Sequence, residues 1–203
     1  MNSNSTDILH RLTASSLEKC LLRLSRVSAG TWRVLNIKIS EGTLEDAVKQ
    51  HDFTNHAAAV YFGLKTGSTL TAIMLLNPAD IECISKCFTG HSFPRGPHTT
   101  PAEEVMLQEL GNIVLNSLVS SLLNTLKKHS IPAVPQYIEG DAAHITGGLG
   151  TVADLKQKFR MIKATLVIQF DKCETNSEVF IMIPDEMALE LERAATGWES
   201  FLL

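Results

Sequence analysis

The sequence lacks the features that mark several large classes of protein. Its 18 Lys and Arg residues are nearly balanced by 22 Asp and Glu residues, and no run of like charge occurs, so we expect no nucleic acid and no anionic membrane as a ligand. No apolar run approaches the roughly 18 residues of a membrane span, and residues 1–12 contain no basic stretch that leads into an apolar one. We therefore expect a cytoplasmic protein with no membrane span, whose partner is a folded protein or a small molecule.

Residues that form metal sites or nucleophilic sites are scattered. The seven His are dispersed, and we interpret His51 and His56 as a chance surface pair. No Ser lies in a G-x-S-x-G elbow, and the Gly-rich stretch 147–150 is not placed between a strand and a helix of a βαβ unit, so we interpret it as a flexible insertion. The closest Cys pair has no second pair to complete a zinc site. We expect buried free thiols at Cys20, Cys83, Cys87 and Cys173.

The apolar pattern of the chain occurs twice. With 44% hydrophobic residues in 203, the chain can bury a sizeable core. The i, i+3, i+7 spacing of a helix face occurs at Leu9, Leu12, Ser16, Cys20 and Leu24, and again 98 residues later at Leu107, Leu110, Val114, Leu118 and Leu122. Segments 72–90 and 179–197 also match, at an offset of 107, as an apolar strand, a Pro, an amphipathic helix and a Gly. The growing offset predicts an insertion of about nine residues, which we place in the Gly-rich stretch 141–155.

Alternating apolar and polar residues predict strands between these helices. The expected strands are 32–39, 59–64 and 69–76 in the first half, and 133–139, 161–170 and 178–183 in the second. Pro135 predicts that the strand 133–139 is an edge strand or a less regular one. Thr100, followed by Pro101 and by Glu103, predicts the start of the second long helix.

These patterns together predict the fold class. We expect a single α/β (α+β) domain over residues 1–203, built from two pseudo-symmetric helix–antiparallel-strand–helix halves. The first half covers 1–90 and the second covers 101–203. The segment 91–100 between them is rich in Gly, Pro, Ser and Thr, and we interpret it as a linker.

The second long helix has an unusual outward face. Mapped at about 100° per residue, the stripe that contains Leu107 and Leu110 is the buried one. The outward side carries Glu109, Asn112, Asn116 and Ser120, flanked by the apolar residues Val105, Ile113, Val119 and Leu123. Apolar residues around a polar centre are typical of a docking surface. The alternative is that Glu109 and Asn112 are ordinary surface residues of an amphipathic helix, and the pattern alone leaves both interpretations open.

The sequence LQELGNIVLNSLVSSLL, residues 107–123, resembles the helix signature of the CheC/CheX/FliY phosphatases of bacterial chemotaxis. That signature is ExxN, usually written EIGNI, and residues 109–113 read ELGNI. The two-half order and the strand IMIP near the end also resemble CheC, so the likeness covers almost the whole chain. The resemblance implies a CheC-like domain that removes the phosphoryl group from the aspartate of a CheY-like response regulator in two-component signalling.

The resemblance also implies roles for single residues. Asn112 would orient the attacking water with its side-chain amide, and Glu109 would dock the partner by pairing with a receiver-domain Lys. An acyl phosphate has a good leaving group and Mg²⁺ in the receiver domain neutralises charge, so Asn112 need not take a proton. We expect no cofactor or metal of the protein's own. Further partner-binding residues on this face are Val105, Ile113, Asn116 and Ser120, and binding of a CheD-like regulator is left open.

The first half departs from the resemblance. Arg11 and Ala14 occupy the positions that correspond to Glu109 and Asn112. Arg offers no acceptor for a Lys and Ala cannot orient water, so we expect a degenerate site there. Asn116 stands where the family tends to have a small residue, and its effect is left open. The alternative to an enzyme is a non-catalytic response-regulator-binding or flagellar-switch-like interaction module.

Overall fold

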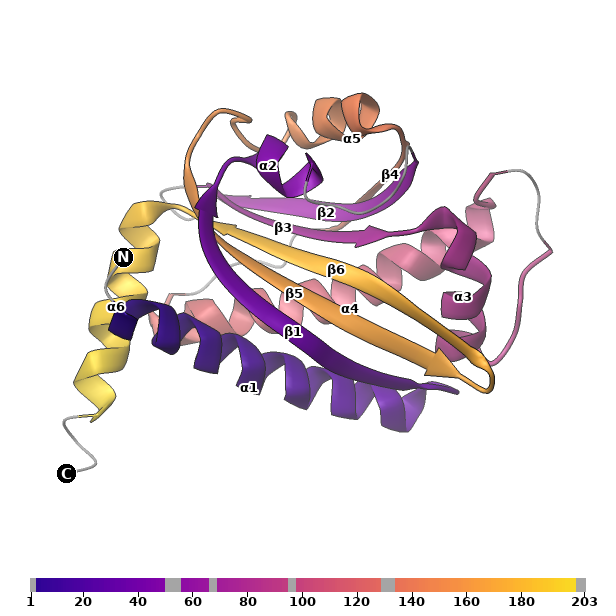
Figure 1. Ribbon diagram of the computed structural model, residues 1–203, viewed down its shortest axis with the longest axis horizontal. Helices are drawn as coiled ribbons and strands as arrows, with labels where there is room; N and C mark the ends of the chain where they lie inside the picture. The colour runs from indigo at the N-terminus through magenta and orange to yellow at the C-terminus, as the bar shows by residue number, and fades with distance from the viewer. Residues whose placement is uncertain (1–2, 50–55, 66–68, 95–97, 129–133, 200–203) are drawn as a thin grey trace.

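The strands pair into one six-stranded antiparallel sheet in the order β1-β5-β6-β3-β2-β4. The computed structural model describes residues 3–49, 56–65, 69–94, 98–128 and 134–199, and helices lie on both faces of the sheet (Figure 1). The strands are β1 (Thr31–Gly42), β2 (Ala57–Lys65), β3 (Thr69–Leu76), β4 (Gln136–Gly140), β5 (Phe159–Phe170) and β6 (Cys173–Ile183). The helices are α1 (Ser3–Val27), α2 (Leu44–Lys49), η1 (Pro78–Asp80, a 3-10 turn), α3 (Ile81–Thr89), α4 (Pro101–Thr125), α5 (Ala142–Leu149) and α6 (Asp185–Glu199). Within the described ranges, no helix combines the length and the apolar character that crossing a membrane requires.

Each half of the chain runs through the same order of elements. A long helix, a strand, a short helix, two paired strands and a closing helix follow one another twice. The long helices α1 and α4 are both 25 residues long and begin 98 residues apart. This order confirms the expected fold class, a single α/β (α+β) domain of two pseudo-symmetric halves. The additional residues of the second half are not confined to 141–155, because β5 and β6 are each three residues longer than β2 and β3.

The two short helices were not predicted from the sequence. Helix α5 includes Gly147 and Gly148, so the interpretation of 147–150 as a flexible insertion is wrong. Asp141 caps this helix, because its carboxylate accepts a hydrogen bond of 2.8 Å from the backbone N–H of His144. Ile145 and Leu149 are fully buried against the sheet. That burial stabilises a helix whose glycines alone would disfavour it.

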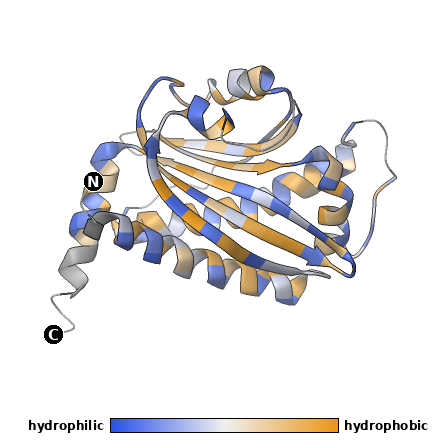
Figure 2. Cartoon of the chain, viewed as in Figure 1, coloured by the Kyte–Doolittle hydropathy of each residue, from blue (hydrophilic) through white to orange (hydrophobic). Residues whose placement is uncertain are grey.

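The helices form two layers with separate apolar cores. Helices α1, α3, α4 and α6 cover one face of the sheet, and α2 and α5 cover the other (Figure 1). Figure 2 shows hydrophobic and hydrophilic residues alternating along β1, mostly hydrophobic residues in the middle of the sheet, and both kinds along the helices. The long helices contact each other directly, since the Ser16 hydroxyl donates a hydrogen bond of 3.2 Å to the carbonyl oxygen of Ser117. Helices α1 and α4 therefore lie side by side on this face of the sheet.

The strand β4 lies at a sheet edge, as Pro135 predicted. It carries Glu139, whose carboxylate accepts a hydrogen bond of 2.8 Å from the Tyr137 hydroxyl. His56 Nε2 lies 3.0 Å from the other oxygen of Glu139 and so joins the start of β2 to β4. Burial raises the pKa of Glu139, but the polar groups of Thr99, Tyr137 and His56 beside its carboxylate outweigh that effect and lower the pKa overall. His51 lies outside the described residues.

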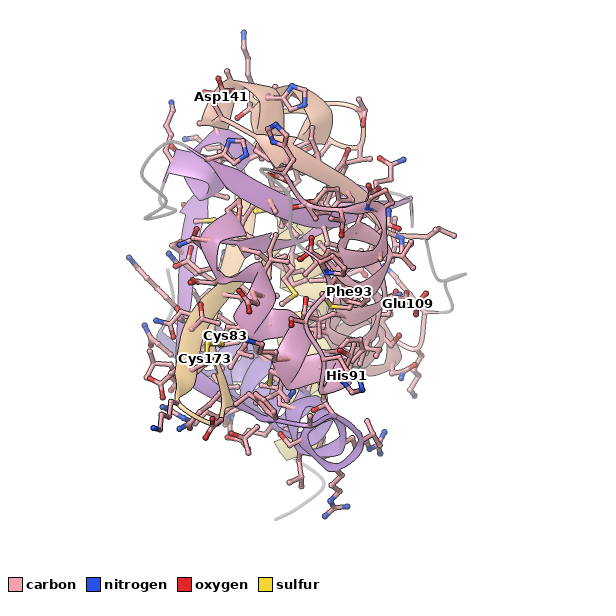
Figure 3. All side chains as sticks on the ribbon, turned by 90° about the vertical axis from the view of Figure 1, so that its right-hand side faces the viewer. Cys83, His91, Phe93, Glu109, Asp141 and Cys173 are labelled. Atoms are coloured by element: carbon pink, nitrogen blue, oxygen red, sulfur yellow. A yellow bond between two sulfur atoms is a disulfide. The ribbon has the colours of Figure 1, made fainter. Side chains whose placement is uncertain are left out.

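A disulfide joins Cys83 of α3 to Cys173 at the start of β6 (Figure 3). The expectation of four free thiols is therefore wrong for this pair and holds for Cys20 and Cys87, which are free and buried. The bonded residues are 90 positions apart and meet because α3 packs on β5 and β6. Disulfides are typical of oxidising compartments and rare in the reducing cytosol. The bonded pair thus gives no support to the expected cytoplasmic location, which stays a prediction.

Candidate functional site

The start of α4 fixes which of its residues point outward. The Thr100 hydroxyl accepts a hydrogen bond from the backbone N–H of Glu103, and the Glu103 carboxylate accepts one from the backbone N–H of Thr100 at 2.8 Å. This capping box satisfies donors at the helix end and begins α4 at Pro101, the position that the sequence predicted. The residues of the predicted buried stripe have no exposed surface: Leu107, Leu110, Val114, Leu118 and Leu122.

The outward face is smaller than the pattern predicted. Glu109 and Ser120 are exposed, and Asn112 and Asn116 are half-buried. Val119 and Leu123 are buried, so they do not flank this face as expected. They pack in the large core beneath α4, because the apolar arc of the helix is wider than the stripe used to define it.

Gly111 brings this part of α4 close to the sheet. A Cβ atom on Gly111 would lie 2.4 Å from Cγ1 of Val60 on β2, which is too close for any side chain. The absence of a side chain therefore lets the helix backbone rest directly on the strand. At the corresponding position of α1, Thr13 is fully buried, so α1 packs on the sheet around a larger residue. Gly111 thus sets the height of its neighbour Asn112 above the sheet.

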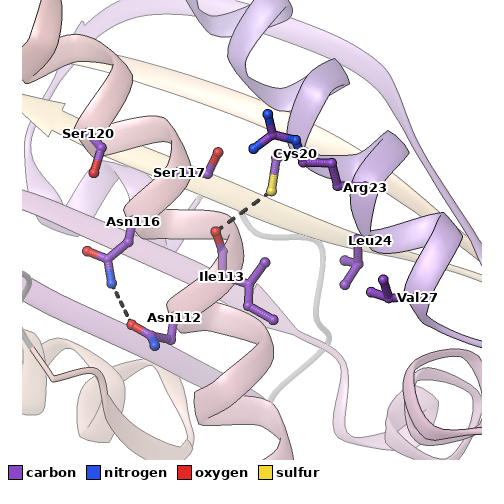
Figure 4. A pocket seen from close by; sticks show the side chains of 9 residues that line it. All are labelled: Cys20, Arg23, Leu24, Val27, Asn112, Ile113, Asn116, Ser117 and Ser120. Carbon is purple, nitrogen blue, oxygen red and sulfur yellow. Dashed lines mark hydrogen bonds between the residues drawn. The ribbon is translucent and has the colours of Figure 1, made fainter.

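A groove with a volume of about 560 Å³ runs between α1 and α4 (Figure 4). Helix α4 contributes Asn112, Ile113, Asn116, Ser117 and Ser120. Helix α1 contributes Cys20, Arg23, Leu24 and Val27. The structure thus brings together four of the six residues predicted on α4 and adds residues of α1 that the sequence analysis missed. The repeated helix face contains Cys20 and Leu24 and so gave a signal for these two residues, but no sequence signal pointed to Arg23 or Val27.

Asn112 and Asn116 are linked within the groove. The Asn116 side-chain amide donates a hydrogen bond of 2.5 Å to the side-chain oxygen of Asn112 (Figure 4). This bond orients the Asn112 amide and occupies one of the two lone pairs on its oxygen. The second lone pair stays available to accept a hydrogen bond from a water molecule. Asn116 therefore leaves Asn112 able to orient water, although it competes for the same oxygen.

Glu109 lies outside the groove, on the outer side of α4 (Figure 3). In the described part of the chain, no residue forms an ion pair or hydrogen bond with its carboxylate. Val105 and Ile113, one turn to either side, are 58% and 40% exposed. The structure therefore divides the predicted site into two parts. One is the groove that contains Asn112, and the other is an outer patch of Val105, Glu109 and Ile113, with Ile113 at the border between the two.

The charge of the groove comes from α1. Arg23 is the charged side chain among the described residues that line it. Burial raises the pKa of the Cys20 thiol, and the hydrogen bond to Ser117 and the charge of Arg23 only partly oppose that effect. The thiol is therefore neutral near pH 7, and its hydrogen bond to the carbonyl oxygen of Ile113, 3.7 Å long, is a structural contact.

The degenerate positions of α1 take no part in the groove. Arg11 is exposed and Ala14 is half-buried, and neither lines it. No cluster of three or more His, Cys, Asp or Glu side chains suited to a metal ion occurs among the described residues. The chemistry available in the groove is therefore that of two amides, two hydroxyls, a thiol and a guanidinium group.

Comparisons with known proteins give a likeness in fold. No protein-family model and no curated protein matches the sequence. The chain is similar to FliY from Thermotoga maritima, with 12% identity, a TM-score of 0.70 and coverage of 97% of this chain and 98% of that chain. It is similar to a chain of the FliG–FliM complex from H. pylori, with 12% identity, a TM-score of 0.63 and coverage of 93% and 99%.

A smaller likeness links the chain to chemotaxis proteins. It is similar to CheX from Vibrio vulnificus, with 12% identity, a TM-score of 0.53 and coverage of 86% of this chain and 97% of that chain. At identities this low, the match is one of backbone arrangement. The resemblance that the ELGNI sequence suggested is thus matched by structure over almost the whole chain, and the protein has the fold of the CheC/CheX/FliY proteins.

Proposed function

We propose that the protein is a phosphatase of the phospho-aspartate in a CheY-like response regulator. The observation that carries this proposal is Asn112, a half-exposed amide held at the wall of the groove by a hydrogen bond from Asn116. Its neighbours in the chain read ELGNI, and Gly111 seats that segment on the sheet. Fold and sequence pattern thus support the same site.

The proposed reaction depends on positioning the attacking water more than on acid–base catalysis. The phosphoryl group of an acyl phosphate leaves readily, and Mg²⁺ bound in the receiver domain neutralises its charge. Asn112 would accept a hydrogen bond from the attacking water through the free lone pair of its oxygen and so aim the water at phosphorus. Asn116 would hold the amide in that orientation through its hydrogen bond of 2.5 Å.

Docking would fall to the outer patch. The Glu109 carboxylate is exposed and has no partner among the described residues, so it can pair with a cationic side chain of the receiver domain. The exposed apolar side chains of Val105 and Ile113 would bury around that pair and exclude water from it. Docking here would bring the phosphorylated loop over the adjoining groove.

A second candidate is a non-catalytic interaction module. It is supported by Asn116, which engages the oxygen that the proposed mechanism needs, and by the loss of Glu and Asn on α1. The fold match to a chain of the FliG–FliM complex is compatible with such a role. A module of this kind would use the outer patch and leave the phosphoryl group intact.

A dephosphorylation assay separates the two candidates. Receiver domains from the same genome would be phosphorylated with a small-molecule donor and followed with and without this protein. The proposed function predicts that at least one receiver loses phosphate faster when the protein is present. Binding of a beryllofluoride-loaded receiver with no acceleration of phosphate loss would support the module and overturn the phosphatase.

A further inference from the structure

We propose that Arg23 of α1 binds the phosphoryl group of the docked receiver domain, so that the degenerate helix supplies a residue to the site on α4. This inference rests on the proposed function and adds a recognition residue to it. Neither the ELGNI sequence nor the helix repeat points to Arg23, because its counterpart 98 residues later is Ser121, which is uncharged and half-buried.

The packing of the long helices places Arg23 along the same groove as Asn112 and Asn116. The contact between the Cys20 thiol and the carbonyl oxygen of Ile113 joins α1 to α4 one turn before Arg23 and one residue after Asn112. Arg23 and both asparagines line the same groove. In Figure 4 the Arg23 side chain extends from α1 toward Ser117 on α4. A group bound between the helices would therefore meet the guanidinium on one wall and the amides on the other.

The Arg23 guanidinium is available for a ligand. Across the described residues, none forms an ion pair with it. The other described residues that line the groove are uncharged, because the Cys20 thiol stays neutral. The groove thus carries a positive charge without a counter-ion on its walls. An anion is the ligand that such an arrangement favours.

The chemistry of the anion follows from the donors. A guanidinium presents a rigid fork of N–H groups that matches two oxygens of a phosphoryl group. The amides and hydroxyls of the groove can donate to further oxygens. A dianionic phosphoryl group satisfies more of these donors than the bare carboxylate of an unphosphorylated receiver. Arg23 would therefore recognise the phosphorylated form of the partner.

This role predicts an effect on binding rather than on the chemical step. The phosphoryl oxygens carry charge both in the bound substrate and in the transition state, so Arg23 stabilises both. Loss of such a contact raises KM and leaves kcat nearly unchanged. The effect differs from that of Asn112, whose contact with the attacking water is needed in the transition state.

The test compares Arg23→Gln, Arg23→Lys and the control Arg26→Gln. Arg26 lies on the same helix, is exposed and does not line the groove. Each variant would be titrated with a receiver domain, loaded or unloaded with beryllofluoride and Mg²⁺, and assayed for KM and kcat. We expect Arg23→Gln to weaken binding of the loaded receiver about tenfold, the scale of one charge-assisted contact at an accessible site. KM should rise to match.

In Arg23→Gln, the affinity for the unloaded receiver and kcat should each change less than about twofold. Arg23→Lys should recover part of the lost affinity for the loaded receiver, because it keeps the positive charge. Arg26→Gln should bind and hydrolyse as wild type does. Equal binding of the loaded receiver by wild type and Arg23→Gln, with phosphatase activity intact, would overturn the role of Arg23 alone. Equal weakening of loaded and unloaded receivers would also overturn it, because it would indicate general docking. A wild-type chain that neither binds nor hydrolyses the phosphorylated receiver would overturn the proposed function together with this inference.

Discussion

Replacing Gly111 with Ala tests whether the close approach of α4 to the sheet holds the site in place. The added Cβ would lie 2.4 Å from Cγ1 and 2.9 Å from Cβ of Val60. Rotation of the Val60 side chain about χ1 moves Cγ1 but not the Cβ of Val60. The contact of the new Cβ with the Cβ of Val60 therefore remains, and helix and strand must move apart. Overpacking of this kind costs about 1–3 kcal/mol, and the better helix propensity of Ala offsets up to about 1 kcal/mol. We expect the free energy of unfolding to fall by about 1–2 kcal/mol.

The same displacement of α4 should also lower the rate of phosphate hydrolysis. Asn112 follows Gly111, so movement of the helix carries the amide away from its position in the groove. Misplacement of a catalytic group by about 1 Å can reduce a rate about 10²-fold, and we expect kcat to fall at least about tenfold. Urea unfolding followed by circular dichroism measures the first effect, and phosphate release from a phosphorylated receiver measures the second.

Two variants control this experiment. Gly147→Ala adds a Cβ that meets nothing within 4 Å on α5, so it should stabilise the protein by up to about 1 kcal/mol and leave kcat unchanged. Val60→Ala removes Cγ1, the nearer contact, so combining it with Gly111→Ala should cost less than the two single changes together. Wild-type stability and activity in Gly111→Ala would refute the reasoning.

Further predictions concern docking, the disulfide and the edge of the sheet. Glu109→Ala should weaken receiver binding roughly tenfold at low salt and less at high salt, measured by titration beside the exposed control Glu186→Ala on α6; equal weakening at all salt concentrations would contradict a charge pair. Serine at both Cys83 and Cys173 should lower the free energy of unfolding by about 2–4 kcal/mol, because the bond closes a long loop; an unchanged melting temperature would show that the bond adds no stability. The lowered pKa of Glu139 gives stability that is present above the carboxylate's unfolded value of about 4.3 and is lost as pH falls through its folded value. Glu139→Gln should therefore flatten acid unfolding curves, and an acid transition identical to wild type would contradict this.

Local signals predicted the parts of the fold that depend on local chemistry. The cap at Thr100 and the 3.6-residue period of the leucines act within α4 itself, so its start and its buried face could be read directly. The strand β3 was predicted with its observed bounds, 69–76, because its signal also lies within the segment itself. Helix α5 could not be predicted, because its glycines oppose a helix and only burial of Ile145 and Leu149 on the sheet stabilises it.

The candidate site depended on contacts between distant segments. Glu109 and Asn112 were found because their spacing on one helix resembles a known signature. The groove was not found, because it exists only where α1 lies against α4. The same holds for the disulfide, whose cysteines are 90 residues apart and meet through the packing of α3 on the β5–β6 hairpin. No local sequence pattern indicates which distant segments come into contact.

The central claim is that the Asn112 amide orients the attacking water, and the rate of phosphate release by Asn112→Ala tests it most directly. Asn124→Ala is the matched control, because Asn124 is exposed on the same helix and does not line the groove. We expect Asn112→Ala to lower kcat by roughly 10²-fold or more, the scale of losing an orienting group, while its Kd for the beryllofluoride-loaded receiver stays nearly unchanged. Asn124→Ala should match wild type in both. Hydrolysis of the phosphorylated receiver by Asn112→Ala at the wild-type rate would contradict the account and favour the interaction module.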